Sequence, residues 1–232
     1  KLLIHIVERL FSDLETKIDN VRIQVGLALS LILNYALAEK DESTFNLIKG
    51  KLTEKIKDSS ISPGIILELA RLAKPMVPVL IKNQKYREAK EILMFFKFCG
   101  QNIALPKDKE REVLNFIKEM GTYQIAEQLV NQLLVSRFSA ENRALEDILF
   151  LLGTENVAQK LVEIFTSEDQ LIRMNALRNL IKIGEVTGPV LAKLLSERKN
   201  FSRKGNSHLL ADDSWYKIRN ALFILSNLVN KD

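Results

Sequence analysis

The chain has 232 residues, of which 47% are hydrophobic and 27% are charged, a composition typical of soluble globular proteins. It contains one cysteine, Cys99, and two histidines. These counts exclude an internal disulfide bond and a zinc site built from Cys and His ligands at the usual spacings. The formal net charge of +5 permits an acidic partner without requiring one.

The sequence contains no uninterrupted apolar run of the roughly 18 residues that a membrane-spanning helix needs. The longest run, Leu27–Leu33, is interrupted by Ser30, and no signal peptide is visible. The first residue is Lys1, which is not a methionine and already belongs to an amphipathic pattern. We therefore expect a cytoplasmic protein, and a chain that is either processed or a piece of a longer one.

The first strong helical pattern covers residues 19–38. Asp19 stands where an N-cap is expected, and the apolar residues that follow it recur with helical spacing. Residues 41–58 predict the next helix, because their apolar residues fall on one face. Nine glycines and five prolines are few for a chain of β-hairpins, so helices joined by short polar links fit better. The apolar face of the helix predicted over residues 41–58 consists of Phe45, Ile48, Leu52 and Ile56.

Residues 59–105 are expected to form an irregular middle. Ser62 before Pro63 predicts a helix start, since proline suits the first turn of a helix. Pro75 and Pro78 each lack a backbone donor, so we expect a kink or a break in this region.

The most aromatic stretch runs from Tyr86 to Gly100. Its three phenylalanines, Phe95, Phe96 and Phe98, cannot all lie on one narrow helical stripe. The segment therefore predicts either a wide buried face or an apolar patch that is exposed for a partner.

Three short stretches of the second half resemble one another. They are GTYQIAEQLV from Gly121, GTENVAQKLV from Gly153 and GEVTGPVLAKLL from Gly184. Each glycine follows the apolar end of a helical pattern, where a left-handed residue closes a helix at low cost. Self-similarity with a period of roughly 32 residues is typical of solenoid proteins, whose helix pairs bury their apolar stripes by stacking.

Two later helices are predicted to begin with a polar cap. Ser167 or Asp169 is expected to cap the helix of residues 166–184, and Asp213 the last helix of the chain. Arg219 follows Arg173 by 46 residues, against a repeat of roughly 32, and the surplus predicts a long basic loop at 196–212.

Three helix starts share a polar turn, then Ile or Val followed by Arg, then small and apolar residues. They contain Val21–Arg22, Ile172–Arg173 and Ile218–Arg219. In this pattern the chain resembles the HEAT repeats, the helix-pair modules of armadillo-like α-solenoids. Asp213 also stands six residues before Arg219, which is the Asp-to-Arg spacing of the family, whereas the other two starts have Thr16 and Ser167 at that offset.

The resemblance covers residues 107–232 well and 1–38 fairly. It implies an all-α fold, namely a right-handed α-solenoid of about twelve HEAT-like helices forming a single domain over residues 1–232. It also implies a non-catalytic scaffold or adaptor that binds a protein partner on the solenoid surface.

Arginine and aromatic side chains most often anchor interfaces, which selects the candidate contacts. The helix starts contribute Arg22, Arg173, Asn175, Arg178, Trp215, Tyr216 and Arg219, and the basic loop contributes Arg198, Lys199, Phe201, Arg203 and Lys204. For Arg22, Arg173 and Arg219 a structural role stays open, in which they form a ladder that bonds neighbouring helix starts.

Two other functions stay open. A nucleic-acid-binding protein would use the basic loop and its flanks to contact phosphates while Phe201 stacks; HEAT-like DNA glycosylases are a variant of this hypothesis. Alternatively, the chain is a purely structural segment of a multidomain protein.

Catalytic motifs are missing from the sequence. It has neither of the glycine-rich phosphate-binding loops nor a G-x-S-x-G nucleophile elbow. Cys99 lies in an apolar context, which disfavours a reactive thiolate. We therefore expect no enzymatic activity, no cofactor and no metal.

Overall fold

The computed structural model describes the backbone of residues 2–56, 62–101, 105–135, 140–164, 167, 169–202 and 212–229, and the side chains of these except 140–142, 197–202, 212–217 and 229. Within these ranges every regular element is a helix, so the predicted all-α fold class is confirmed. The contacts divide the chain into two compact units, Lys1–Ile117 and Lys118–Asp232, here called unit 1 and unit 2 and described separately. The single domain over 1–232 stays a prediction.

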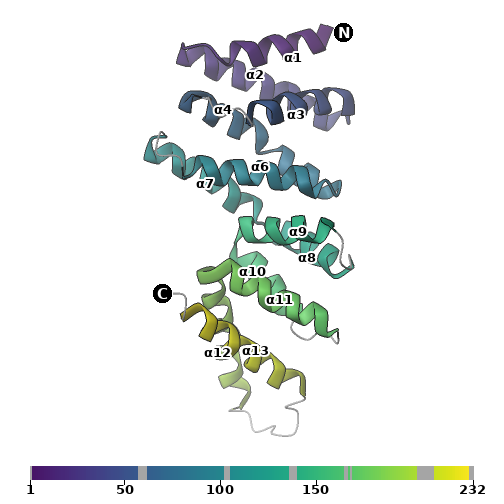
Figure 1. Cartoon of the computed structure of the whole chain (residues 1–232), viewed down its shortest axis with the longest axis vertical. Helices are drawn as coiled ribbons and strands as arrows, with labels where there is room; N and C mark the ends of the chain where they lie inside the picture. The colour runs from purple at the N-terminus through teal and green to yellow at the C-terminus, as the bar shows by residue number, and fades with distance from the viewer. Residues whose placement is uncertain are drawn as a thin grey trace. The chain divides into compact units, whose positions relative to one another are not determined.

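In unit 1 the first six helices each pack on a neighbour in sequence, and most also pack on a helix further along the chain (Figure 1). The helices are α1 (Leu2–Asp13), α2 (Asp19–Ala38), α3 (Glu42–Ile56), α4 (Pro63–Ala73), α5 (Met76–Lys82), α6 (Tyr86–Cys99) and α7 (Lys107–Met120), whose last residues belong to unit 2. α1 contacts α2 and α3, and α2 contacts α3 and α4. α4 in turn contacts α6, and the short helix α5 contacts both α4 and α6.

Unit 2 shows the same packing between helices that are one and two apart. Its helices are α8 (Tyr123–Val135), α9 (Ala140–Leu152), α10 (Glu155–Glu163), α11 (Gln170–Ile183), the 3-10 helix η2 (Gly184–Val186), α12 (Thr187–Ser202) and α13 (Asp212–Val229). α8 contacts α9 and α10, and α11 contacts α9, α10 and α13. Each helix therefore buries its apolar stripe against more than one partner.

The core of unit 1 includes a cluster of aromatic rings around Phe96 of α6, which is fully buried. Its ring centre lies 6.1 Å from that of Phe95 and 6.0 Å from that of Phe116, the latter edge-to-face at 74°, a geometry that aromatic pairs favour. Cys99 is buried as well, and its burial raises the pKa of the thiol to about 12. Cys99 is therefore a protonated core residue at neutral pH and not a nucleophile.

Two predicted helix starts are confirmed. Asp169 is the N-cap of α11, and its carboxylate accepts hydrogen bonds from the backbone N–H groups of Leu171 and Ile172. Ser62 is the N-cap of α4, with Pro63 at the first helical position.

The prediction that Asp19 caps α2 is wrong. Ile18, in an extended conformation, is the N-cap, and Asp19 is the first residue of the helix. Its carboxylate pairs with Arg22 one turn later. A carboxylate is favourable in this first turn because the helix dipole is positive there, so the same residue stabilises the helix start from a different position.

The predicted break in the middle of the chain is confirmed. α4 ends at Ala73, and α5 begins at Met76 with Pro75 as its N-cap. Pro78 lies in the first turn of α5, where a backbone N–H would have no acceptor within the helix. Pro78 is therefore tolerated in α5, and the break falls at Pro75.

The three similar glycines have two different roles. Gly153 and Gly184 have φ angles of +45° and +82°, the left-handed conformation predicted for them. Gly121 is not among the glycines with positive φ. A Cβ atom there would lie 2.6 Å from Oγ1 of Thr154 and closer still to the methyl group of that side chain. The carbonyl oxygen of Gly121 also accepts hydrogen bonds from Thr154 and Asn156, at 3.0 and 2.9 Å. Glycine is therefore needed at 121 for a close approach.

The predicted loop over 196–212 is wrong in its first part, because α12 continues to Ser202. Arg198, Lys199 and Phe201 therefore belong to a helix. The segment 196–202 contains neither glycine nor proline, so nothing in it opposes helix continuation. Residues 203–211, with Arg203 and Lys204, lie outside the described residues.

α2 is long and apolar enough, by length and composition alone, to cross a membrane. The mean hydropathy is 1.5 over an 18-residue window, of which 28% is buried, and no other helix of the described residues passes the same test. The sequence lacks an uninterrupted apolar run, but polar residues such as Ser30 and Asn34 do not lower the average enough to fail it. Core helices of soluble proteins also pass, so one such helix is weak evidence for a membrane span.

Candidate protein-binding site

Two of the predicted contact residues are bonded within their own helix starts. Arg22 donates a hydrogen bond to the carbonyl oxygen of Thr16, at 3.3 Å, and Arg173 donates one to that of Ser167. Both acceptors stand six residues earlier in the chain. The side chain of Arg22 is only 12% exposed, so it lies mostly inside the structure. These two arginines therefore fasten the preceding turn to the helix.

Arg178 joins two helices of unit 2. Its guanidinium donates to the Asn175 side-chain oxygen at 2.6 Å and to Glu146 of α9 at 3.1 Å. Arg219 is exposed on α13. Arg22 belongs to unit 1 and the other four described candidates to unit 2, so they are not one described cluster.

The remaining candidates cannot be placed as a surface. The side chains of Arg198, Lys199, Phe201, Trp215 and Tyr216 lie outside the described side chains, although their backbones are helical. The nucleic-acid-binding hypothesis, which relies on this segment, stays a prediction.

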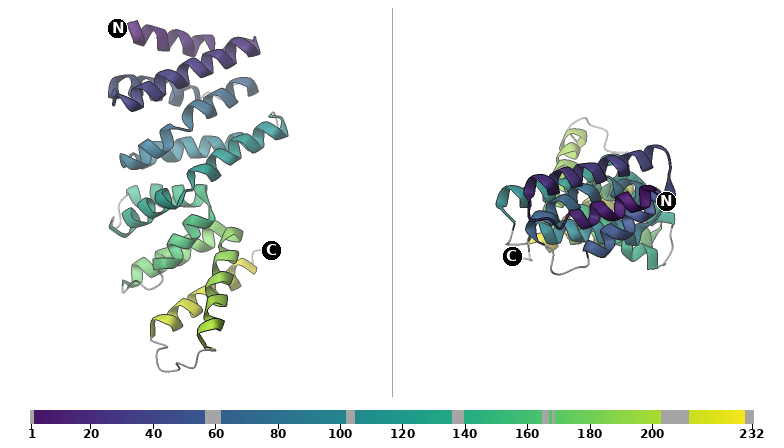
Figure 2. Two further views of the ribbon diagram at one scale, coloured as in Figure 1. Left: turned by 180° about the vertical axis from the view of Figure 1, so that it is seen from behind. Right: turned by 90° about the horizontal axis from the view of Figure 1, so that it is seen from above.

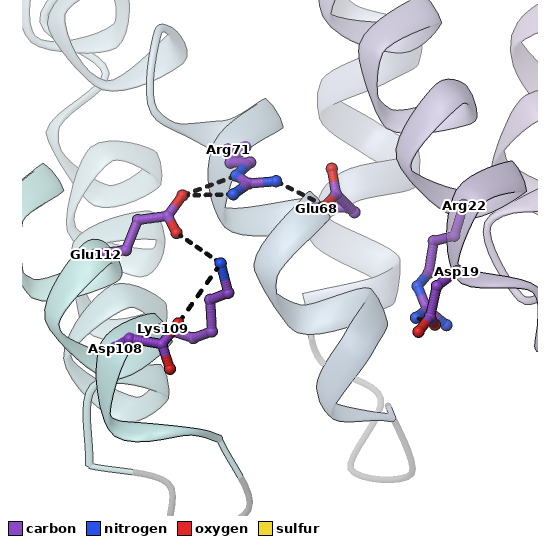
Figure 3. Close-up of polar contacts among 7 residues, drawn as sticks. All are labelled: Asp19, Arg22, Glu68, Arg71, Asp108, Lys109 and Glu112. Atoms are coloured by element: carbon purple, nitrogen blue, oxygen red, sulfur yellow. Dashed lines mark hydrogen bonds and ion pairs between the residues drawn. The ribbon is translucent and has the colours of Figure 1, made fainter.

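A polar network that the sequence did not reveal links α4 to α7 in unit 1 (Figure 3). Arg71 binds Glu68 one turn before it on α4, at 2.9 Å, and Glu112 of α7 at 2.7 and 2.8 Å. Lys109 lies 3.5 Å from the second oxygen of Glu112. The network thus places one arginine between two carboxylates.

Glu68 is the most buried member of this network, with 6% of its surface exposed. Burial raises the pKa of its carboxyl group above the usual value, against the lowering effects of Arg71 and Arg22. The carboxylate lies against α2 at Gly26, where a Cβ atom would be 2.6 Å from Oε2 of Glu68. The Glu68 carboxylate therefore lies at a close contact between α4 and α2, and Arg71 is its ion-pair partner.

Glu68→Gln is expected to raise the free energy of unfolding at neutral pH relative to the wild type. The pKa of the Glu68 carboxyl group is higher in the folded than in the unfolded protein. Its contribution to the free energy of unfolding is therefore fully present below the unfolded-state pKa of about 4.3 and is lost as pH rises through the folded-state pKa. The difference between variant and wild type should therefore grow with pH in urea titrations between about pH 4 and 7. Glu54→Gln, at an exposed site of α3, is the control; an equal pH dependence in both variants would contradict the assignment.

A cavity of about 440 Å³ lies beside Arg22. It contains a mixture of polar and apolar groups, and two of its cations already have carboxylate partners, since Arg22 pairs with Asp19 and Lys55 with Glu15. A ligand anion would have to compete with these carboxylates. The cavity is lined by Phe11, Leu14, Glu15, Thr16, Lys17, Arg22, Lys55, Ser62, Ile65 and Leu69.

A second pocket, of about 290 Å³, lies between the end of α3 and α6 and is here called the α6 pocket. It is lined by Thr53, Ile56, Glu91, Ile92, Met94, Phe95 and Phe98. Phe98 and Met94 are 62% and 52% exposed, whereas Phe95 and Phe96 are buried. The expectation that the three phenylalanines cannot share one buried stripe is confirmed.

The α6 pocket is suited to an apolar side chain of a partner. Thr53 and Glu91 are the polar members of its lining, and the rest are aliphatic, thioether or aromatic groups. Methionine and aromatic side chains are enriched at protein interfaces, and methionine adapts its shape to different partners. Ile56 and Met94 were not predicted to line a pocket. The spacing of Glu91, Met94, Phe95 and Phe98 nevertheless marks one face of α6.

The described residues contain no group of three or more His, Cys, Asp or Glu side chains arranged to hold a metal ion.

No family model matches the chain, and no curated protein matches it. Among solved structures, a crystal structure of an engineered protein aligns with 97% of this chain and 96% of its own chain, at 18% identity and a TM-score of 0.36. A similarity this weak carries no argument about architecture or function.

Proposed function

We propose that the chain is a non-catalytic scaffold of HEAT-like helix pairs, and that the α6 pocket receives an apolar side chain of a protein partner. The single observation that carries the proposal is the exposure of Phe98 and Met94 at the rim of a pocket with an apolar wall. Large side chains left in water next to such a wall are typical of interaction sites.

Polar contacts between helices support the solenoid part of the proposal. Lys49 of α3 binds Glu88 of α6 at 2.7 Å, and Lys160 of α10 binds Glu127 of α8 at 2.9 Å. The sequence separations are 39 and 33 residues, close to the length of one helix pair in repeat proteins. Such contacts are expected where similar helix pairs stack on their neighbours.

Selection of peptides from a random library displayed on phage, with the 232-residue chain immobilised, tests the binding site. Enriched peptides are expected to carry a large apolar residue and to bind Phe98→Glu and Met94→Glu at least about tenfold more weakly, since an apolar anchor at an interface is worth 1.4 kcal/mol or more. Both side chains are mostly exposed, so the variants should keep the helical circular dichroism of the wild type.

Arg87→Glu supplies the matched control, because Arg87 is exposed at the other end of the same helix. Its affinity for the selected peptides should equal that of the wild type. Peptides that bind the Phe98 and Met94 variants as tightly as the wild type would show that the α6 pocket is not the binding site.

A further inference from the structure

Exposed apolar side chains gather on the first two helices. Of the 18 large apolar side chains that are exposed in the described residues, nine lie within residues 2–35. The most exposed on these helices include Leu2, at 76%, and Leu31, at 70%. Monomers rarely expose large contiguous apolar patches without a use for them.

Leu27, Leu31 and Tyr35 lie on the side of α2 that faces away from α4. Arg22 and Gly26 mark the side toward α4, because they approach Gly64 and Glu68. Residues 24, 27, 28, 31 and 35 lie on the opposite side, since they are three, four or seven residues apart. Viewed from above in Figure 2, α1 and α2 lie side by side, and the later helices of unit 1 lie behind them.

A shallow groove of about 410 Å³ runs between α1 and α2 on this side. It is lined by Leu10, Asn20, Val21, Gln24, Val25 and Ala28. By helical spacing Ile6 shares a side of α1 with Leu10, and Leu27 and Leu31 share a side of α2 with Gln24 and Ala28. We call this surface the N-terminal face, defined by Ile6, Leu10, Val21, Leu27, Leu31 and Tyr35.

The N-terminal face is nearly free of net charge. α2 carries no charged residue from Ile23 to Ala38. On α1, Arg9 and Asp13 form an ion pair with each other at 3.2 Å. A charged surface would repel a second copy of itself across a two-fold axis, whereas this surface does not.

We propose that the N-terminal face is a self-association surface, on which two copies of the chain pack α1 and α2 against α1 and α2 about a two-fold axis. Leu27, Leu31 and Tyr35 are four residues apart and form the kind of ridge that packs between the ridges of a facing helix. α2 has 20 residues and α1 has 12, so they are about 30 and 18 Å long, and at a helix width of about 10 to 12 Å together they give a face on the order of 500 to 600 Å². Two copies would then bury about 1,000 to 1,200 Å² in total, which is at the lower limit for specific interfaces and suits a weak dimer.

Sedimentation velocity of the 232-residue chain between about 1 and 100 µM tests the proposal, because a dimer of micromolar affinity dissociates over this range. We expect a concentration-dependent dimer for the wild type. Combining Leu27→Glu with Leu31→Glu is expected to weaken dimerisation at least about 100-fold, since carboxylates would then be buried opposite one another. Both leucines are more than half exposed, so the variant should keep its helical content and thermal stability.

Combining Phe98→Glu with Met94→Glu is the matched control, because it places the same two charges on exposed apolar sites of the α6 pocket. It should dimerise like the wild type even though it loses peptide binding, so the two proposals fail independently. A wild-type chain that stays monomeric at all concentrations would overturn the inference. If that monomer floats with phosphatidylcholine vesicles, the N-terminal face binds a lipid surface instead of a second copy. A dimer that persists in the variant combining Leu27→Glu with Leu31→Glu would overturn the inference as well.

Discussion

Phe96→Ala is expected to lower the free energy of unfolding by about 4 kcal/mol, the largest single effect anticipated for this chain. Phe96 is fully buried and contacts the rings of Phe95 and Phe116. Truncation removes the transfer free energy of the ring and leaves a cavity between α6 and α7 that the helices cannot fill completely. The aromatic edge-to-face contact with Phe116 is lost in addition, at about 1 kcal/mol.

The measurement is urea denaturation followed by far-ultraviolet circular dichroism. Phe98→Ala supplies the control, since it removes the same ring two residues later on the same helix, at a site that is 62% exposed. Its free energy of unfolding should change by less than about 1 kcal/mol. Equal losses in the two variants would contradict the burial of Phe96.

Gly121→Ala is expected to destabilise unit 2 by about 2 to 3 kcal/mol. The new methyl group would collide with Thr154, whose branched side chain has little rotamer freedom. The same contact holds the two hydrogen bonds that Thr154 and Asn156 donate to the Gly121 carbonyl. A backbone shift that relieves the collision would therefore weaken these bonds as well.

Gly50→Ala is the control for this variant, because a Cβ atom at Gly50 of α3 would meet nothing within 4 Å. That variant should gain roughly 0.5 to 1 kcal/mol through the better helix propensity of alanine. Far-ultraviolet circular dichroism in urea measures both variants, and the fluorescence of Trp215, the single tryptophan, reports in addition on unit 2, to which Trp215 and Gly121 belong. Unchanged or increased stability of Gly121→Ala would show that the approach of Thr154 is not tight.

The sequence predicted those features that local chemistry decides. The cap at Asp169 and the break at Pro75 follow from side-chain and backbone groups within a few residues. The geometry of one helix predicts that three neighbouring rings cannot share one narrow stripe, but not that Phe98 is the exposed ring. The all-α fold class follows from helical periodicity along the whole chain.

Features that depend on contacts between helices were not predicted. Glu68 stands in a mostly apolar stretch, and nothing near it in sequence indicates that it lies at a helix contact or that its partner Arg71 also binds Glu112 of α7. Gly121 looks identical to Gly153 in the aligned stretches, yet its role is set by Thr154, 33 residues away. The end of α12 was misplaced because serines and charged residues suggest a loop without forbidding a helix.

The candidate site was predicted in part. The aromatic stretch identified α6, but the pocket also needs Ile56 from α3, and no pattern within α6 points to that residue. The apolar residues of α2 predicted a helix, but periodicity alone does not tell which of its two apolar sides is covered by another helix.

The short reach of Arg22 and Arg173 has a consequence for how such a chain can change its length. Each guanidinium bonds to a carbonyl oxygen only six residues before it, so the fastening of a helix start is encoded by the same short segment that forms it. A gene duplication or deletion that copies or removes a whole helix pair would carry this fastening with it. Loss of one helix pair would then leave these arginine–carbonyl hydrogen bonds intact at the starts of the remaining helices. New contacts would be needed only between the apolar sides of the helices that become neighbours.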